Sequence, residues 1–95
     1  MDFDWNNLPF NLDQTLTLEA IEESFEDPFA VRLLPDSPRY AVQARFFNLG
    51  VAANGVGIFT VFRTNGKQTQ VIFARPFEKE EQYFYQRRLN QALAQ

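Results

Sequence analysis

Four cations are the residues of this chain best suited to chemistry on an anionic substrate. They fall within residues 43–77, a stretch that contains no acidic side chain, and they are Arg45, Arg63, Lys67 and Arg75. An arginine guanidinium presents planar donors that match the geometry of a phosphate, and it stays protonated at physiological pH. The pattern therefore suits binding of a phosphate-bearing partner by this part of the chain.

Histidine and cysteine are both absent from the sequence. Their absence removes the commonest general base, the commonest metal ligands and the thiolate nucleophile. The sequence also contains no phosphate-cradling glycine loop and no Gly-x-Ser-x-Gly elbow. Arginine, lysine, carboxylate and tyrosine remain, and these suit cleavage of RNA by its own 2′-hydroxyl, where the protein offsets charge on the phosphate. We expect no metal ion and no other cofactor.

The net charge of −3 conceals an uneven distribution along the chain. Residues 1–36 contain nine acids and one base, whereas residues 37–95 contain three acids and eight bases. The basic second half suits an anionic partner. The alternative is that the two halves neutralise each other in the fold, with the arginines of the second half paired to acids of the first.

An antiparallel sheet is the element expected to carry the four cations. Asn54-Gly55 and Asn65-Gly66 lie eleven positions apart, and each pair is flanked by apolar, β-branched and aromatic residues. Asn-Gly tolerates the backbone of a tight type I′ hairpin turn, so the stretch predicts three strands joined by two such turns. In each strand an arginine shares its parity with apolar residues, which indicates a sheet with both faces substantially covered.

Two helices are expected on either side of this meander. Residues 17–25 predict a short helix, capped by Thr15 or Thr17, with its glutamates facing water. The sequence after Phe77 predicts a C-terminal helix. Its apolar residues follow the i, i+4, i+7, i+8 spacing of a buried stripe, formed by Tyr85, Leu89, Ala92 and Leu93.

Short stretches at residues 1–5 and 30–34 predict two further strands. The whole chain, residues 1–95, is expected to form a single α+β domain, because its length suits one core and its fifteen aromatic residues can fill it. No apolar run approaches the roughly 20 residues of a membrane span, and no signal-peptide pattern opens the chain. We therefore expect a cytoplasmic protein without a membrane partner.

The order of several short motifs resembles the BrnT family of small ribonuclease toxins. The likeness spans nearly the whole chain, and it rests on Phe3-Asp4-Trp5, Leu18-Glu19-Ala20-Ile21-Glu22, Phe25-Glu26-Asp27-Pro28, Arg45-Phe46, Leu49-Gly50, Val61 to Arg63, Ile72-Phe73-Ala74-Arg75, and Glu81 with Tyr85. BrnT toxins have a RelE-like fold and a BrnA antitoxin as their partner. The resemblance therefore implies the toxin component of a type II toxin–antitoxin pair, with RNA as its ligand and a BrnA-like protein as its partner.

The resemblance also implies roles for individual residues in a metal-independent endoribonuclease. The catalytic set would be Arg63, Arg75, Glu81 and Tyr85, with the arginines on the scissile phosphate and Glu81 or Tyr85 assisting proton transfer. Arg45 would bind the substrate. Lys67 is expected to bind it as well, because it is a cation of the same acid-free stretch and not because of the resemblance.

This chain departs from the BrnT pattern near its start. The segment between Trp5 and Ala20 is shorter than in typical members, and the usual Lys-His pair is missing, with Asn11 as the remaining counterpart. That lysine is associated with toxicity in the family. RNA binding is therefore expected to survive the loss more readily than RNA cleavage.

A function of a different class also fits the composition. In this alternative the chain is a non-enzymatic protein-interaction module, whose acidic half docks a basic partner or whose aromatic surface mediates self-association into a homo-oligomer. A third reading places the arginines in buried ion pairs. Removing one of them would then cost stability and not ligand binding.

Overall fold

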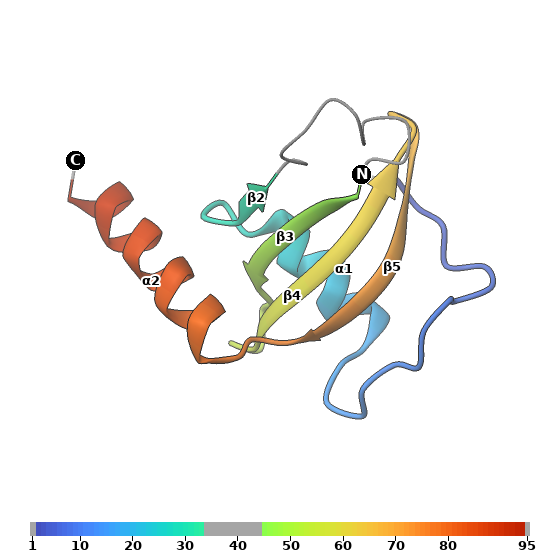
Figure 1. The fold of residues 1–95 in the computed structure, drawn as a ribbon, viewed down its shortest axis with the longest axis horizontal. Helices are drawn as coiled ribbons and strands as arrows, with labels where there is room; N and C mark the ends of the chain where they lie inside the picture. The colour runs from blue at the N-terminus through green and yellow to red at the C-terminus, as the bar shows by residue number, and fades with distance from the viewer. Residues whose placement is uncertain (1, 34–44, 95) are drawn as a thin grey trace.

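A five-stranded sheet, in the order β1-β5-β4-β3-β2, is the framework of the fold (Figure 1). The structure is a computed structural model that describes residues 2–33 and 45–94. Its elements in chain order are β1 Asp2–Phe3, α1 Leu18–Glu26, β2 Val31–Leu33, β3 Phe46–Val51, β4 Gly57–Thr64, β5 Gln68–Pro76 and α2 Lys79–Leu93. Strand β1 pairs with β5 in parallel, and the other neighbours pair antiparallel. The predicted α+β class is confirmed.

The β3–β4–β5 meander confirms the predicted strands, but the prediction of type I′ turns between them is wrong. A type I′ turn needs positive φ at both central residues, and in the two Asn-Gly pairs Gly55 (φ 89°) and Gly66 (φ 91°) alone have it. The Gly55 N–H donates to the Ala52 carbonyl at 2.9 Å, so a three-residue connection ends in a left-handed glycine. In the second turn the Asn65 side chain accepts hydrogen bonds from two backbone N–H groups that follow it.

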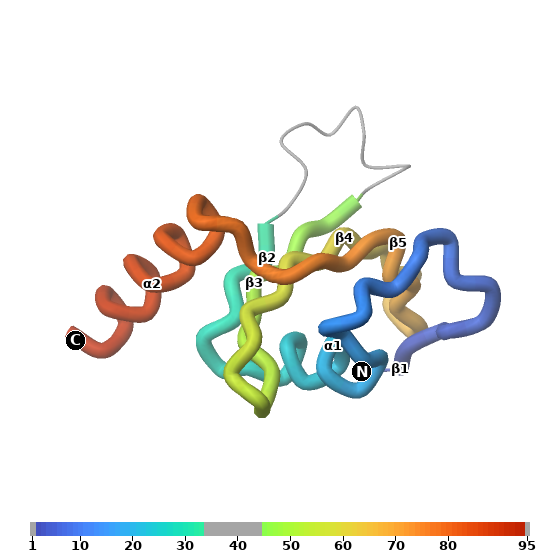
Figure 2. Tube along the Cα trace, turned by 90° about the horizontal axis from the view of Figure 1, so that it is seen from below, coloured from blue at the N-terminus to red at the C-terminus, as the bar shows by residue number. Residues whose placement is uncertain are grey.

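Helix α1 covers one face of the sheet. In Figure 2 the helix lies below the strands. Thr17 is its N-cap, and the Thr17 Oγ1 accepts a hydrogen bond from the Ala20 N–H at 3.0 Å. The buried core between helix and sheet consists of Leu16, Ala20, Ile21, Phe25, Ala52, Ile58, Phe62, Val71 and Ala74. The predicted helix at residues 17–25 is therefore confirmed, together with its apolar face.

The close contact between α1 and β3 depends on Gly50. A Cβ atom at this position would stand 1.9 Å from the backbone oxygen of Ser24, in the last turn of α1. The side chain of Asn48, which is fully buried, donates to the same oxygen at 3.3 Å. These two positions of β3 therefore fix how closely α1 approaches the sheet.

Helix α2 leaves the end of β5 and projects to one side of the sheet (Figures 1 and 2). Of the predicted buried stripe, Tyr85 alone is buried, whereas Ala92 is exposed and 65 % of Leu93 is exposed. The prediction of a buried stripe is wrong for Ala92 and Leu93, and Leu89 is only partly buried, because the later turns of α2 extend away from the strands. Within the described ranges, neither helix is long and apolar enough to cross a membrane.

The face opposite α1 is less uniformly covered: Leu49 is buried there and Phe47, Phe59 and Val61 are partly buried, whereas Phe73 is exposed. In the described part of the chain, no helix lies over the middle of the face opposite α1 (Figures 1 and 2). Strand β2 confirms the strand predicted at residues 30–34, whose last residue lies outside the described ranges. Strand β1 confirms the short edge strand predicted at residues 1–5.

Candidate functional site

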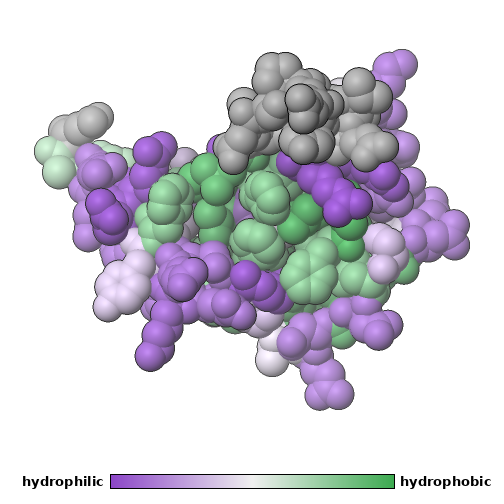
Figure 3. All heavy atoms as spheres, viewed as in Figure 1, coloured by the Kyte–Doolittle hydropathy of each residue, from purple (hydrophilic) through white to green (hydrophobic). Residues whose placement is uncertain are grey.

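The face of the sheet opposite α1, which we call the outer face, is organised into rows by the strand pairing. The rows that cross β3, β4 and β5 are Leu49–Phe59–Arg75, Phe47–Val61–Phe73 and, on β4 and β5, Arg63–Gln70. Hydrophobic side chains gather in the middle of this face, and hydrophilic ones surround them (Figure 3). The outer face therefore combines an apolar centre with arginines on two sides of it.

Arg75 is held on the outer face by three contacts. Its guanidinium lies 4.5 Å from the centre of the Phe59 ring, which is a cation–π arrangement. The Arg75 Nη1 donates to the Glu81 Oε1 at 2.5 Å and to the Pro76 carbonyl at 3.2 Å. The Arg75 side chain nevertheless keeps 27 % of its surface exposed, so it is not closed off from a ligand.

Glu81 links Arg75 to the start of α2. The Glu81 carboxylate also accepts a hydrogen bond from the Glu78 N–H at 2.8 Å, which completes a capping box, and only 15 % of the side chain is exposed. The hydrogen bond from Arg75 lowers the pKa of Glu81, and the same contact raises the pKa of Arg75. Glu81 is therefore an ionised partner of Arg75 at neutral pH.

This ion pair predicts a loss of stability in acid. A carboxyl whose pKa is lowered by folding from 4.5 adds stability that is complete above the unfolded pKa and disappears as pH falls through the folded pKa. Glu81→Gln should be less stable than the unchanged chain at neutral pH, and the difference should shrink as the pH falls below 4.5. Urea unfolding followed by Trp5 fluorescence measures the stability of both proteins at each pH. A difference that stays constant down to about pH 3 would contradict this assignment.

Tyr85 is bound to a residue that the sequence analysis did not select. Its hydroxyl donates to the Asp27 Oδ2 at 2.6 Å, and the same carboxylate oxygen accepts from the Val51 N–H at 2.9 Å. The Asp27 Oδ1 accepts from the Phe29 N–H. Burial, together with the Asp27 carboxylate, raises the pKa of the Tyr85 hydroxyl. Glu81 and Tyr85, although one helical turn apart, therefore act on different partners.

Asp27 was missed because its partners are distant in sequence. Its position directly after α1 and before a proline is a local signal, since such an aspartate often accepts from a backbone N–H two residues ahead. That signal predicts the bond to Phe29, but not the bonds to β3 and α2. Asp27 thus joins the end of α1, the end of β3 and the second turn of α2.

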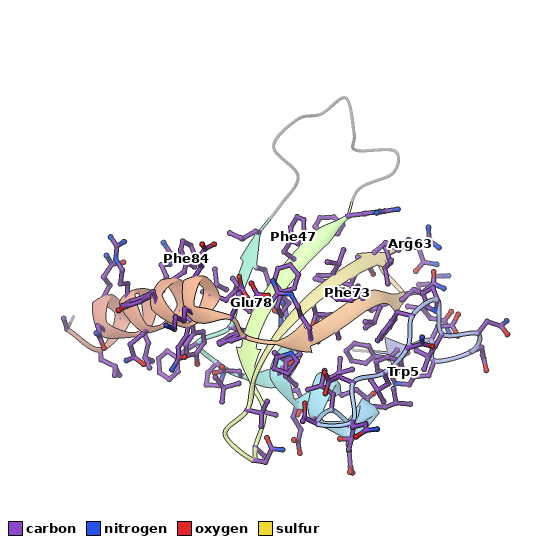
Figure 4. All side chains as sticks on the ribbon, turned by 60° about the horizontal axis from the view of Figure 1, so that its bottom comes forward. Trp5, Phe47, Arg63, Phe73, Glu78 and Phe84 are labelled. Atoms are coloured by element: carbon purple, nitrogen blue, oxygen red, sulfur yellow. The ribbon has the colours of Figure 1, made fainter. Side chains whose placement is uncertain are left out.

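The remaining cations lie at the opposite end of the outer face from Arg75. The Arg63 Nε donates to the Gln70 Oε1 at 2.8 Å, and Arg63 is exposed (Figure 4). Lys67 is exposed in the β4–β5 turn. Arg45 is exposed directly before β3, and continuing the β3–β4 register by one residue places it opposite Arg63. Arg45, Arg63 and Lys67 thus form one basic end of the sheet.

The structure does not bring Arg63 and Arg75 to one point. Arg75 pairs with Phe59, four residues from Arg63 along β4, which corresponds to about 13 Å. Among the residues that the structure describes, the ion pairs of Arg75 are with Glu81 and Glu78, both from the second half of the chain. The described ion pairs therefore do not join these arginines to the acidic first half.

A cleft of about 380 Å³ lies between the β3–β4 turn and the first turns of α2. Its walls are formed by Val51, Gly55, Val56, Gly57, Pro76, Phe77, Gln82, Tyr85 and Gln86. None of these residues is charged, and Tyr85 is the one predicted site residue among them. An anionic ligand is therefore better accommodated by the outer face than by this cleft.

No family model, curated protein or solved structure matches this chain. Within residues 2–33 and 45–94, no group of three or more Asp and Glu side chains is placed to hold a metal ion. The chemistry that the described residues offer is binding of negative charge by arginine.

Proposed function

We propose that this chain is an RNA-binding, BrnT-like toxin component and that its outer face holds the RNA. The observation that supports the RNA site is that Arg63 and Arg75 lie on the same face, about 13 Å apart, on strands that contain no acidic residue. Two separated cations suit a ligand with repeated negative charges, and each phosphate of RNA can accept charge-assisted hydrogen bonds from a guanidinium.

The geometry favours RNA binding over RNA cleavage. A general acid or base works best when its pKa lies near the working pH. The pKa of Glu81 is lowered by Arg75, and the pKa of Tyr85 is raised by burial and by Asp27, so both are moved away from neutrality. Arg63 and Arg75 also donate to different side chains, Gln70 and Glu81, so their guanidinium groups are not arranged around one phosphate in this structure. Metal-independent cleavage is therefore a separate outcome of the test below.

Replacing both arginines should weaken RNA binding. Each charge-assisted contact at an exposed site contributes about 1 kcal/mol or more, so Arg63→Ala/Arg75→Ala is expected to lower the affinity by about 10- to 100-fold. Purified protein is incubated with mixed cellular RNA, the retained RNA is measured on a filter, and cleavage is read on a gel. Circular dichroism verifies that the variant is folded.

The matched control is Arg87→Ala/Arg88→Ala, which removes the same charge from exposed positions of α2. It should retain RNA as well as the unchanged chain does. Arg63→Ala alone is a second arm that disturbs little of the fold, because Arg63 contacts Gln70 at the surface. Equal RNA retention by the two double variants would contradict RNA binding by the outer face. If the unchanged chain cleaves RNA and Arg63→Ala/Arg75→Ala does not, the proposal would be extended to catalysis.

A protein-interaction module is the second candidate, and exposed apolar side chains favour it. Phe73 on the outer face and Phe84 on α2 are each about two-fifths exposed, and Leu33 on β2 is exposed as well. Under the first proposal the protein partner is a BrnA-like antitoxin, which follows from the sequence resemblance. A chain that binds a protein partner but no RNA would favour the second candidate.

A further inference from the structure

The outer face carries a row of apolar residues that phosphate binding by arginine does not explain. We call it the aromatic row, because two of its three residues, Phe47 and Phe73, are aromatic and the third is Val61. Phe47, Val61 and Phe73 stand opposite one another on three adjacent strands. Phe73 is 41 % exposed, and Phe47 and Val61 are partly exposed. Phe47 and Phe73 lie on the same side of the sheet as Arg63 (Figure 4). A contiguous apolar surface rimmed by polar residues is typical of a binding site.

The aromatic row stands between the two arginine rows. Along β4, Val61 is two residues from Arg63 on one side and two residues from Phe59, the partner of Arg75, on the other, which is about 7 Å in each direction. Phe47 and Phe73 are two strands apart, or about 10 Å. The outer face thus alternates cation, aromatic surface and cation along the strands.

Building on the proposed RNA binding, we propose that Phe47 and Phe73 stack against unpaired bases of single-stranded RNA whose phosphates contact Arg63 and Arg75. Base faces are accessible in single strands, whereas in an A-form duplex they are buried in the base-pair stack. Stacking tolerates every base, because each has a flat π-face. The ligand class is therefore single-stranded RNA without a strong sequence preference, and duplex RNA is a poor ligand.

Fluorescence anisotropy with labelled oligonucleotides tests this assignment. The probes are unpaired oligo-U and oligo-A of about 12 nucleotides and an RNA duplex of the same length. The unchanged chain should bind both single strands more tightly than the duplex. Phe47→Leu and Phe73→Leu should each weaken single-strand binding by about 5- to 100-fold, since leucine keeps apolar contact but cannot stack. Phe73→Trp should retain the affinity.

Phe84→Leu is the matched control, because Phe84 has the same exposure as Phe73 but lies on α2, outside the row. It should leave the affinity unchanged. Phe73→Leu is the decisive variant, because Phe73 is the most exposed member of the row. Its ring also packs edge-on against Phe10, with centroids 6.1 Å apart, so circular dichroism verifies that the variant is folded.

Three results would overturn the stacking proposal, and they differ in what they leave standing. If the leucine variants bind RNA normally while Arg63→Ala/Arg75→Ala does not, stacking is wrong and the arginine site remains. Equal affinity for duplex and single strands also excludes stacking while leaving RNA binding in place. If the unchanged chain binds none of the probes, both stacking and the proposed function are wrong.

Discussion

Gly50→Ala is expected to destabilise the fold by about 3 kcal/mol or more, at the upper end of what overpacking usually costs. The new Cβ would stand 1.9 Å from the Ser24 backbone oxygen, far inside van der Waals contact. The helix cannot move away cheaply, because Ile21 and Phe25 on either side of Ser24 are buried against the sheet. A chain of this size has a total stability of roughly 5–15 kcal/mol, so the loss is a large fraction of it.

Urea unfolding monitored by Trp5 fluorescence measures this effect. The matched control is Gly57→Ala on the adjacent strand, where the new Cβ would meet the Phe77 ring and not backbone. The Phe77 side chain must then move as a whole, but displacing one partly buried side chain costs less than displacing the backbone of α1, so the control should lose less stability. If the two variants unfold at the same urea concentration, α1 does not rest on Gly50 as closely as described.

Asp27→Ala is expected to cost about 3 kcal/mol, the second large effect. Each buried donor left without an acceptor costs about 1–3 kcal/mol. The substitution leaves two donors without their acceptor, the Tyr85 hydroxyl and the Val51 N–H. Tyr85→Phe removes the hydroxyl itself and should cost about 1 kcal/mol. When Asp27 is already alanine, Tyr85→Phe should cost little further, because the two residues form one interaction.

A double-mutant cycle of urea unfolding curves measures this coupling. Glu26→Ala is the matched control, since it removes an exposed acid from the neighbouring position and should change stability by less than about 0.5 kcal/mol. Hydrogen exchange in α2 is expected to accelerate in Asp27→Ala, because Tyr85 is the buried anchor of that helix. Full additivity of the two substitutions would contradict the anchoring role of Asp27.

Much of the secondary structure could be predicted because its signals are local. The Thr17 cap, the apolar face of α1 and the two Asn-Gly pairs each act within a few residues. The turn types could not be predicted, since the hydrogen bond between Gly55 and Ala52 sets the loop length and depends on the strand register. The exposed end of α2 was also missed, because periodicity reports which residues share a side of a helix, not whether anything covers it.

The candidate site could be predicted only in part. The alternation of side chains along each strand indicates which residues share a face of the sheet with Arg63 or with Arg75. The distance between the two arginines depends on the register of β4 with β5, which places Arg75 opposite Phe59. Arg75 and Glu81 are six residues apart, on either side of the junction between β5 and α2. A contact over this distance is about the longest that a local sequence pattern can predict. The bond between Tyr85 and Asp27 spans 58 residues and exists only through tertiary packing.

The salt dependence of the affinity for unpaired RNA tests most directly whether the outer face contacts phosphates. Each contact with a single strand contributes about 0.7 to the slope of log K against log salt concentration. Arg63→Ala/Arg75→Ala should therefore reduce the slope by about 1.4, while Arg87→Ala/Arg88→Ala should keep the slope of the unchanged chain. The same slope in all three proteins would contradict RNA binding by Arg63 and Arg75.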